Sequence, residues 1–143
     1  MSYAAAENDR RTANILMLGT VTSVNAGSAR ARVSFGDLES PDIPVGQFRA
    51  GALSFWWMPA TGEQVLVGCP GGDVAQGVIL CSVFAGNAPS ADAATPMIEL
   101  NGGTLQINGS IELTGDVTAQ GISLVTHRHG GVQSGGTTTG EPQ

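Results

Sequence analysis

The fold of this chain is decided by residues 98–124, which read IELNGGTLQINGSIELTGDVTAQGISL. Pairs of apolar residues recur here every five to seven positions, and short turn sequences that contain glycine separate them. The pairs are Ile98/Leu100, Leu105/Ile107, Ile111/Leu113, Val117/Ala119 and Ile122/Leu124. Each repeat therefore reads as a very short strand with two side chains on one face, too short to bury them within a single chain.

These repeats require stacking, and the length of the run indicates how they stack. Five units cannot complete two triangular coils in one chain, which would leave open strand edges and almost no core. Three chains wound about a common axis pair every edge and enclose a narrow core that suits aliphatic side chains. We therefore predict an intertwined, trimeric triple-stranded β-helix shaft over residues 97–125. The alternative is a plain meander of hairpins with Asn-Gly turns.

The residues before the repeats differ from them in composition and predicted fold. Both tryptophans, all four phenylalanines and both cysteines precede residue 85, so we expect the aromatic core in this part. Short β-patterned segments are separated by turn sequences, with a bulge expected at Gly19; the segments are 15–24, 29–35, 55–58, 64–69 and 74–84. Five short strands without a long helical pattern predict a Greek-key barrel of the OB type over residues 15–86, in an all-β chain.

The remaining segments and the two cysteines have simpler interpretations. Residues 1–14 are polar and form either a short helix or an arm that orders on a partner, and residues 87–96 form a linker or collar. Cys69 and Cys81 are interpreted as reduced core residues, the alternative being a zinc site with a histidine. The first residues lack an apolar signal segment, so we expect synthesis in the cytoplasm without Sec export.

The charge distribution excludes some partners. The net charge is −6, and beyond residue 50 there is one cation, Arg128, against seven acidic residues. A nucleic-acid partner demands a basic stripe, which is missing, and electrostatic adhesion to an anionic membrane is disfavoured for the same reason. Trp56 and Trp57 are therefore interpreted as core and inter-subunit packing residues.

The only histidines, His127 and His129, are the candidate metal ligands. In an extended segment, residues i and i+2 point to the same side, so the two imidazoles are presented together. Two imidazoles supply at most half a metal site. A closed site with these ligands requires further copies of the chain.

Two stretches resemble a known family. Residues 55–80, FWWMPATGEQVLVGCPGGDVAQGVIL, resemble the OB domain of phage baseplate assembly protein V, the central spike of P2-like contractile tails. The apex signature of that family is similar to His127-Arg128-His129-Gly130-Gly131-Val132-Gln133, followed by Thr139-Gly140-Glu141-Pro142. With the repeats between them, the resemblance extends from about Ile15 over nearly the whole chain.

The resemblance implies a homotrimeric needle in the tail baseplate of a virion. Its OB domain docks on a baseplate hub protein, and its tip, residues 126–143, crosses the outer membrane of a Gram-negative host when the sheath contracts. It further implies an iron ion held by six histidines, which are His127 and His129 of each chain, and calcium and chloride ions on the axis.

The donor set supports a structural role for such an ion. Six neutral imidazoles make an octahedral nitrogen site, which suits iron(II), nickel or cobalt and disfavours zinc. Because protein fills every position, no site stays open for water or substrate, and we expect no enzyme activity and no catalytic residues. Two alternatives stay open: a metalloenzyme in which Glu141 completes an open iron site, and a carbohydrate- or receptor-binding trimeric fibre module.

Overall fold

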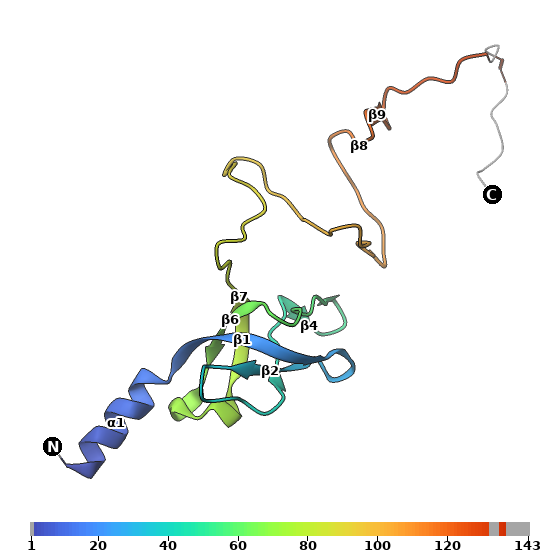
Figure 1. Ribbon diagram of the computed structural model, residues 1–143. Helices are drawn as coiled ribbons and strands as arrows, with labels where there is room; N and C mark the ends of the chain where they lie inside the picture. The colour runs from blue at the N-terminus through green and yellow to red at the C-terminus, as the bar shows by residue number, and fades with distance from the viewer. Residues whose placement is uncertain (1, 132–134, 137–143) are drawn as a thin grey trace. The chain divides into compact units, whose positions relative to one another are not determined.

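The computed structural model describes residues 2–131 and 135–136 of the chain (Figure 1). The chain divides into two units, Met1–Met97 and Ile98–Gln143, and each is described by itself. The described helices are too short or too polar to cross a membrane.

The first unit is a closed barrel of short strands preceded by a helix. Its five-stranded sheet has the order β3-β2-β1-β6-β7. The edge strands meet through a parallel bridge between Val45 and Ile79, and the Gly46 amide donates to the Ile79 carbonyl at 2.8 Å. This closure confirms the predicted barrel. The elements are α1 (Tyr3–Ala13), β1 (Leu16–Asn25), η1 (Ala26–Ser28), β2 (Arg30–Ser34), β3 (Ile43–Pro44), β4 (Arg49–Ala50), β5 (Ser54–Phe55), β6 (Gln64–Gly68), η2 (Pro70–Gly72), η3 (Val74–Gln76) and β7 (Val78–Ser82).

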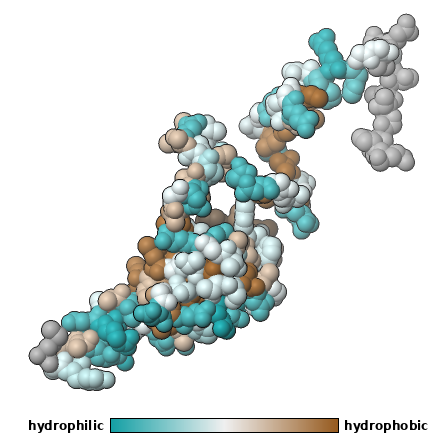
Figure 2. All heavy atoms as spheres, viewed as in Figure 1, coloured by the Kyte–Doolittle hydropathy of each residue, from teal (hydrophilic) through white to brown (hydrophobic). Residues whose placement is uncertain are grey.

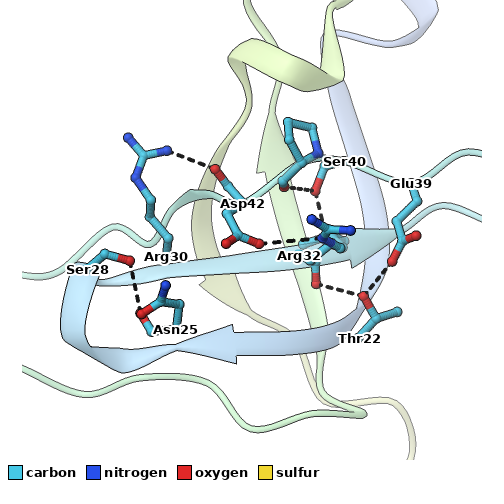
Figure 3. Close-up of polar contacts among 10 residues, drawn as sticks. Thr22, Asn25, Ser28, Arg30, Arg32, Glu39, Ser40 and Asp42 are labelled. Atoms are coloured by element: carbon cyan, nitrogen blue, oxygen red, sulfur yellow. Dashed lines mark hydrogen bonds and ion pairs between the residues drawn. The ribbon is translucent and has the colours of Figure 1, made fainter.

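Strand β2 shows how the sequence pattern creates the barrel wall. Ala31 and Val33 are fully buried, whereas Arg30 and Arg32 between them are exposed, as the alternation predicted. Glu39, Ser40 and Asp42, in the segment that follows β2, bond back to β1 and β2 (Figure 3). The barrel therefore has one polar outer face, and its interior is filled by Val21, Ala31, Val33, Ile43, Val65, Val67, Cys69 and Ile79.

The predicted aromatic core is wrong, because the barrel interior is aliphatic. Of the aromatic side chains, only that of Phe35 packs against the core as a partly buried residue. The exposed aromatic residues are Tyr3, Phe48, Phe55, Trp56, Trp57 and Phe84. The closed barrel is narrow, and small β-branched side chains fill it without strain.

Two of the expected strands are shorter in the structure than predicted. Of the expected strand 55–58 only its first residue is in a strand, Ser54–Phe55, and Trp56 and Trp57 continue as an irregular, exposed segment. The expected strand 74–84 is shorter, because Val74–Gln76 forms a 3-10 turn before β7. High β-propensity alone does not create a strand where no neighbouring backbone is available for pairing.

Gly19 and Cys81 also differ from expectation. The bulge in β1 lies between Val21 and Ser23, and Gly19 instead lies in regular register with β6. Cys69 is a free, buried cysteine, and burial, followed by the charge of Asp73, raises the pKa of its thiol. Cys81 is free but exposed, so its assignment to the core is wrong.

The second unit has little internal pairing. Within its described residues the strands are β8 (Thr118–Ala119) and β9 (Ile122–Ser123), which form a hairpin. The hairpin turns at Gln120 and Gly121, whose positive φ angles of 51° and 82° fit a two-residue turn of the kind that the meander alternative requires. The repeats from 98 to 113 form no strands within the described chain, so the triple-stranded β-helix stays a prediction.

Candidate metal-binding tip and associated surfaces

The β8–β9 hairpin leads directly to the two histidines. The Leu124 amide donates to the Val117 carbonyl at 2.8 Å, which extends the pairing beyond β9. The chain then turns, and the His127 amide donates to the Ser123 carbonyl at 3.2 Å. The hairpin therefore supplies the local scaffold from which His127 projects.

The contacts of His127 define which of its ring nitrogens is free. Its Nδ1 atom lies 2.9 Å from the Ser123 carbonyl oxygen and 3.1 Å from that of Leu124. Both partners accept hydrogen bonds, so in the neutral ring these contacts assign the proton to Nδ1. The Nε2 lone pair is then available, which is the form in which an imidazole binds a metal.

The structure brings the two predicted ligands together. The rings of His127 and His129 have centroids 5.2 Å apart with an interplanar angle of 81°, and both residues are exposed. Among residues 2–131 and 135–136, no group of three or more His, Cys, Asp or Glu side chains could hold a metal ion. A neutral imidazole pair fits a first-row transition metal by its chemistry, but one chain supplies only part of a ligand set.

Several predicted tip residues lie outside the described part of the chain. They are residues 132–134 and 137–143, which include Glu141, the proposed third ligand of the metalloenzyme alternative. The zinc alternative with Cys69 and Cys81 is not found among the described residues.

Asp116, which precedes β8, is a further residue of the candidate site that the sequence pattern did not reveal. Its carboxylate accepts a hydrogen bond from the Val125 amide at 3.1 Å, across nine positions of sequence. Hydrogen bonding by the Ser123 hydroxyl, and then by the Val125 amide, holds the pKa of Asp116 below its usual range. Its position just before the fourth apolar pair was the available signal, although an exposed acid on a repeat protein is usually a solvated residue.

A second exposed feature is an aromatic cluster beside the β4–β5 hairpin, formed by Phe48, Phe55 and Trp57. The ring of Phe55 packs edge-on against Phe48 at 5.4 Å and stacks with Trp57 at 6.1 Å. The Gln47 side chain holds the Trp57 backbone, because its Oε1 accepts from the Trp57 amide at 2.8 Å and its Nε2 donates to the Trp57 carbonyl at 3.3 Å. The cluster is therefore pre-organised although it is exposed.

The cationic side chains on β2 are already paired. Arg30 donates to the Asp42 carbonyl at 2.8 Å, and Arg32 lies 3.5 Å from the Asp42 carboxylate (Figure 3). Glu39 accepts from the Thr22 hydroxyl beside them. This face therefore mixes both signs of charge, unlike the basic stripe of a nucleic-acid-binding OB domain.

Comparison with known proteins gives one match in the barrel and one in the C-terminal part of the chain. The sequence model of the type VI secretion system and phage-baseplate injector OB domain matches residues 17–84, and that of the GpV apex motif matches residues 121–143. The spike protein of Escherichia phage P2 is 27% identical over 91 residues, which cover 64% of this chain and 43% of that protein. The chain thus spans less than half the length of this relative.

The two matched motifs coincide with the two structural features described above. The injector OB domain falls on the closed barrel, and the apex motif begins within the β8–β9 hairpin and includes both histidines. In its barrel and in its C-terminal part, the chain is therefore similar to the phage-baseplate proteins that carry these two motifs.

Proposed function

We propose that this protein is the homotrimeric central spike of a contractile injection particle. On sheath contraction its tip punctures the outer membrane of a Gram-negative host. The observation that carries the proposal is a run of apolar repeats, placed between the injector OB domain and the apex motif, whose side chains find no core within one chain.

The exposure of the repeat residues supports the trimer. Nine large apolar side chains of the second unit are exposed, with fractions between 40% for Val117 and 71% for Val125, and Leu100 is partly buried. Figure 2 shows hydrophobic residues at the surface of this unit. Burying one such side chain stabilises an assembly by about 1.5–3 kcal/mol, so an isolated chain leaves much free energy unused. Three intertwined copies bury these side chains against one another.

We propose that the tip is rigidified by one iron ion per trimer. Three copies of His127 and His129 supply six imidazoles, and within each copy the geometry of His127 leaves Nε2 free. A bound ion would cross-link the three chains near their apex, and its binding free energy would add to the stability of the tip. Calcium or chloride ions on the axis are assigned to no residue.

The barrel is proposed to attach the spike to the baseplate. Its exposed aromatic cluster (Phe48, Phe55 and Trp57) has the character of a protein contact, since aromatic side chains are enriched at such interfaces. We assign the barrel to docking on the hub protein, and we assign no catalytic activity and no nucleic-acid partner. Penetration of the membrane is then mechanical.

Two measurements on the purified chain test the proposal. Sedimentation should give a trimer, and elemental analysis should give one metal ion per three chains. Replacing both histidines, His127→Ala with His129→Ala, should abolish stoichiometric metal and leave the trimer, whereas Arg128→Ala between them should keep the metal. A monomer, or one ion per single chain, would contradict the spike assignment.

A further inference from the structure

We propose that Ser123 is the positioning residue of the metal-binding tip, and that it works with Asp116 to hold His127 with Nε2 free for a metal. The inference rests on the proposed metal site and adds the residues that orient its ligand. Three steps of geometry carry it, from the hairpin to the turn and from the turn to the ring.

The first step is the closure of the hairpin exit by Asp116. Its carboxylate receives the Val125 amide at 3.1 Å, so the residue before β8 is tied to the segment after β9. Between residues 101 and 131, Ser123 alone is partly buried.

The second step is the use of both accepting positions of the Ser123 hydroxyl oxygen. A hydroxyl has one proton to donate and two lone pairs to accept with. The Ser123 oxygen accepts from the Thr126 amide at 2.9 Å and from the Thr126 hydroxyl at 2.9 Å. The turn that precedes His127 is therefore fixed by this one oxygen atom.

The third step is the contact between the Ser123 carbonyl and the ring of His127. The carbonyl of the same Ser123 accepts from the His127 amide at 3.2 Å and from Nδ1 at 2.9 Å. Histidine ligands of metals usually donate their second ring nitrogen to a carbonyl or carboxylate, and loss of such a partner lowers metal affinity about 10–100-fold. Ser123 supplies that carbonyl and, through its hydroxyl, holds the carbonyl in place.

Cobalt(II) titration of the metal-free full chain tests the inference, because cobalt(II) suits octahedral nitrogen and has a visible spectrum. Ser123→Ala should lower the affinity about 10-fold or more, with the trimer retained. Ser123→Thr, which keeps a hydroxyl, should restore most of the affinity. The exposed Ser110 provides the control, and Ser110→Ala should bind as the unchanged chain does. Asp116→Ala should resemble Ser123→Ala, whereas Asp116→Asn keeps an acceptor for Val125 and should lose less.

A second readout needs no metal. Imidazole ¹⁵N shifts of the metal-free chain should report His127 with its proton on Nδ1, and Ser123→Ala should give a mixture of the two tautomers. Unchanged tautomer and unchanged cobalt(II) affinity in Ser123→Ala would overturn the inference, as would loss of the trimer in that variant or an equal loss of affinity in Ser110→Ala. If the unchanged chain binds no cobalt(II), the proposed metal site is wrong, and the tautomer measurement alone decides the role of Ser123.

Discussion

Gly19 lies where β1 passes close to the end of β2, and its hydrogen side chain is required there. A methyl group at this position would meet the Val33 Cγ1 atom at 2.5 Å and the Ser34 carbonyl oxygen at 2.8 Å. Because backbone in a paired strand cannot move freely, Gly19→Ala should lower the free energy of unfolding by about 1–3 kcal/mol. Denaturant unfolding followed by circular dichroism measures this. Gly51→Ala has open space around it and serves as the control; equal stability of the two variants would refute the packing argument.

Ser40 is a buried polar residue of the barrel, only 3% exposed. It forms hydrogen bonds with Val33 through its backbone amide and through its hydroxyl. Its amide donates to the Val33 carbonyl at 2.9 Å, and its hydroxyl accepts from the Val33 amide at 3.0 Å. Ser40→Ala leaves the buried Val33 amide without its acceptor and should cost about 1–3 kcal/mol. Thermal unfolding gives the test, with the exposed Ser28→Ala as control. A melting temperature equal to that of the control would mean that water replaces the hydroxyl.

At the scale of single residues, the proximity of the two histidines was easier to predict than the burial of the tryptophans. His127 and His129 were found as a pair because no other histidines compete for the assignment and two-residue spacing restricts their directions. Ser123 and Asp116 were not found, because their role depends on a turn that no local pattern announces. The tryptophans were assigned to core and inter-subunit packing because the charge disfavours a nucleic-acid partner, and this argument does not distinguish a barrel interior from an exposed contact surface.

None of the residues of helix α1 is buried, so local contacts supply much of its support, and the Arg11 backbone also lies against Gly72 of η2. Ser2 caps the helix, and Glu7 pairs with Arg10 and Arg11 at 2.8 Å each. These hydrogen bonds, that of Arg10 first, lower the pKa of Glu7 from 4.5 to about 2. A depressed pKa in the folded helix means that this support is present above pH 4.5 and is lost as the pH falls through about 2.

Glu7→Gln should therefore reduce the helix content of residues 3–13 at neutral pH and remove its dependence on pH between 4.5 and 2. Carbon-13 chemical shifts of these residues measure the helix directly, apart from the barrel. Asp9→Asn in the same helix is the control and should leave the shifts almost unchanged. Equal helix content in Glu7→Gln and the unchanged chain at pH 7 would show that the helix does not depend on these ion pairs.

The elements that sequence predicted well are those with strict alternation. Strands β1, β2 and β6 occur within one residue of their expected positions, because each alternates or buries residues against two neighbours. Strand β3 was missed, since two residues around Pro44 give no periodic signal and its pairing depends on barrel closure. Short elements of this kind are defined by their partners in space.

At the scale of the whole molecule, the two units differ in whether one copy of the chain is enough to form a buried core. The barrel closes on its own residues, so its strand order follows from one copy. The repeats of the second unit do not bury their apolar side chains in one copy. The proposed arrangement of these repeats as a trimeric shaft requires a partner surface, and the stability of the assembly tests it.

The neighbours Leu113 and Glu112 provide that test. In an isolated chain Leu113 is 59% exposed, so Leu113→Ala should change stability by no more than about 0.5 kcal/mol. In an intertwined trimer the same change removes three buried side chains, each of which costs about 2–5 kcal/mol. We expect the larger effect, seen as a lower melting temperature and dissociation to monomers at lower denaturant concentration in sedimentation experiments. Glu112→Gln, which alternation directs away from the axis, should leave both quantities close to those of the unchanged chain. If Leu113→Ala matches Glu112→Gln, the repeats do not form a shared core, and the shaft assignment is wrong even if the metal site survives.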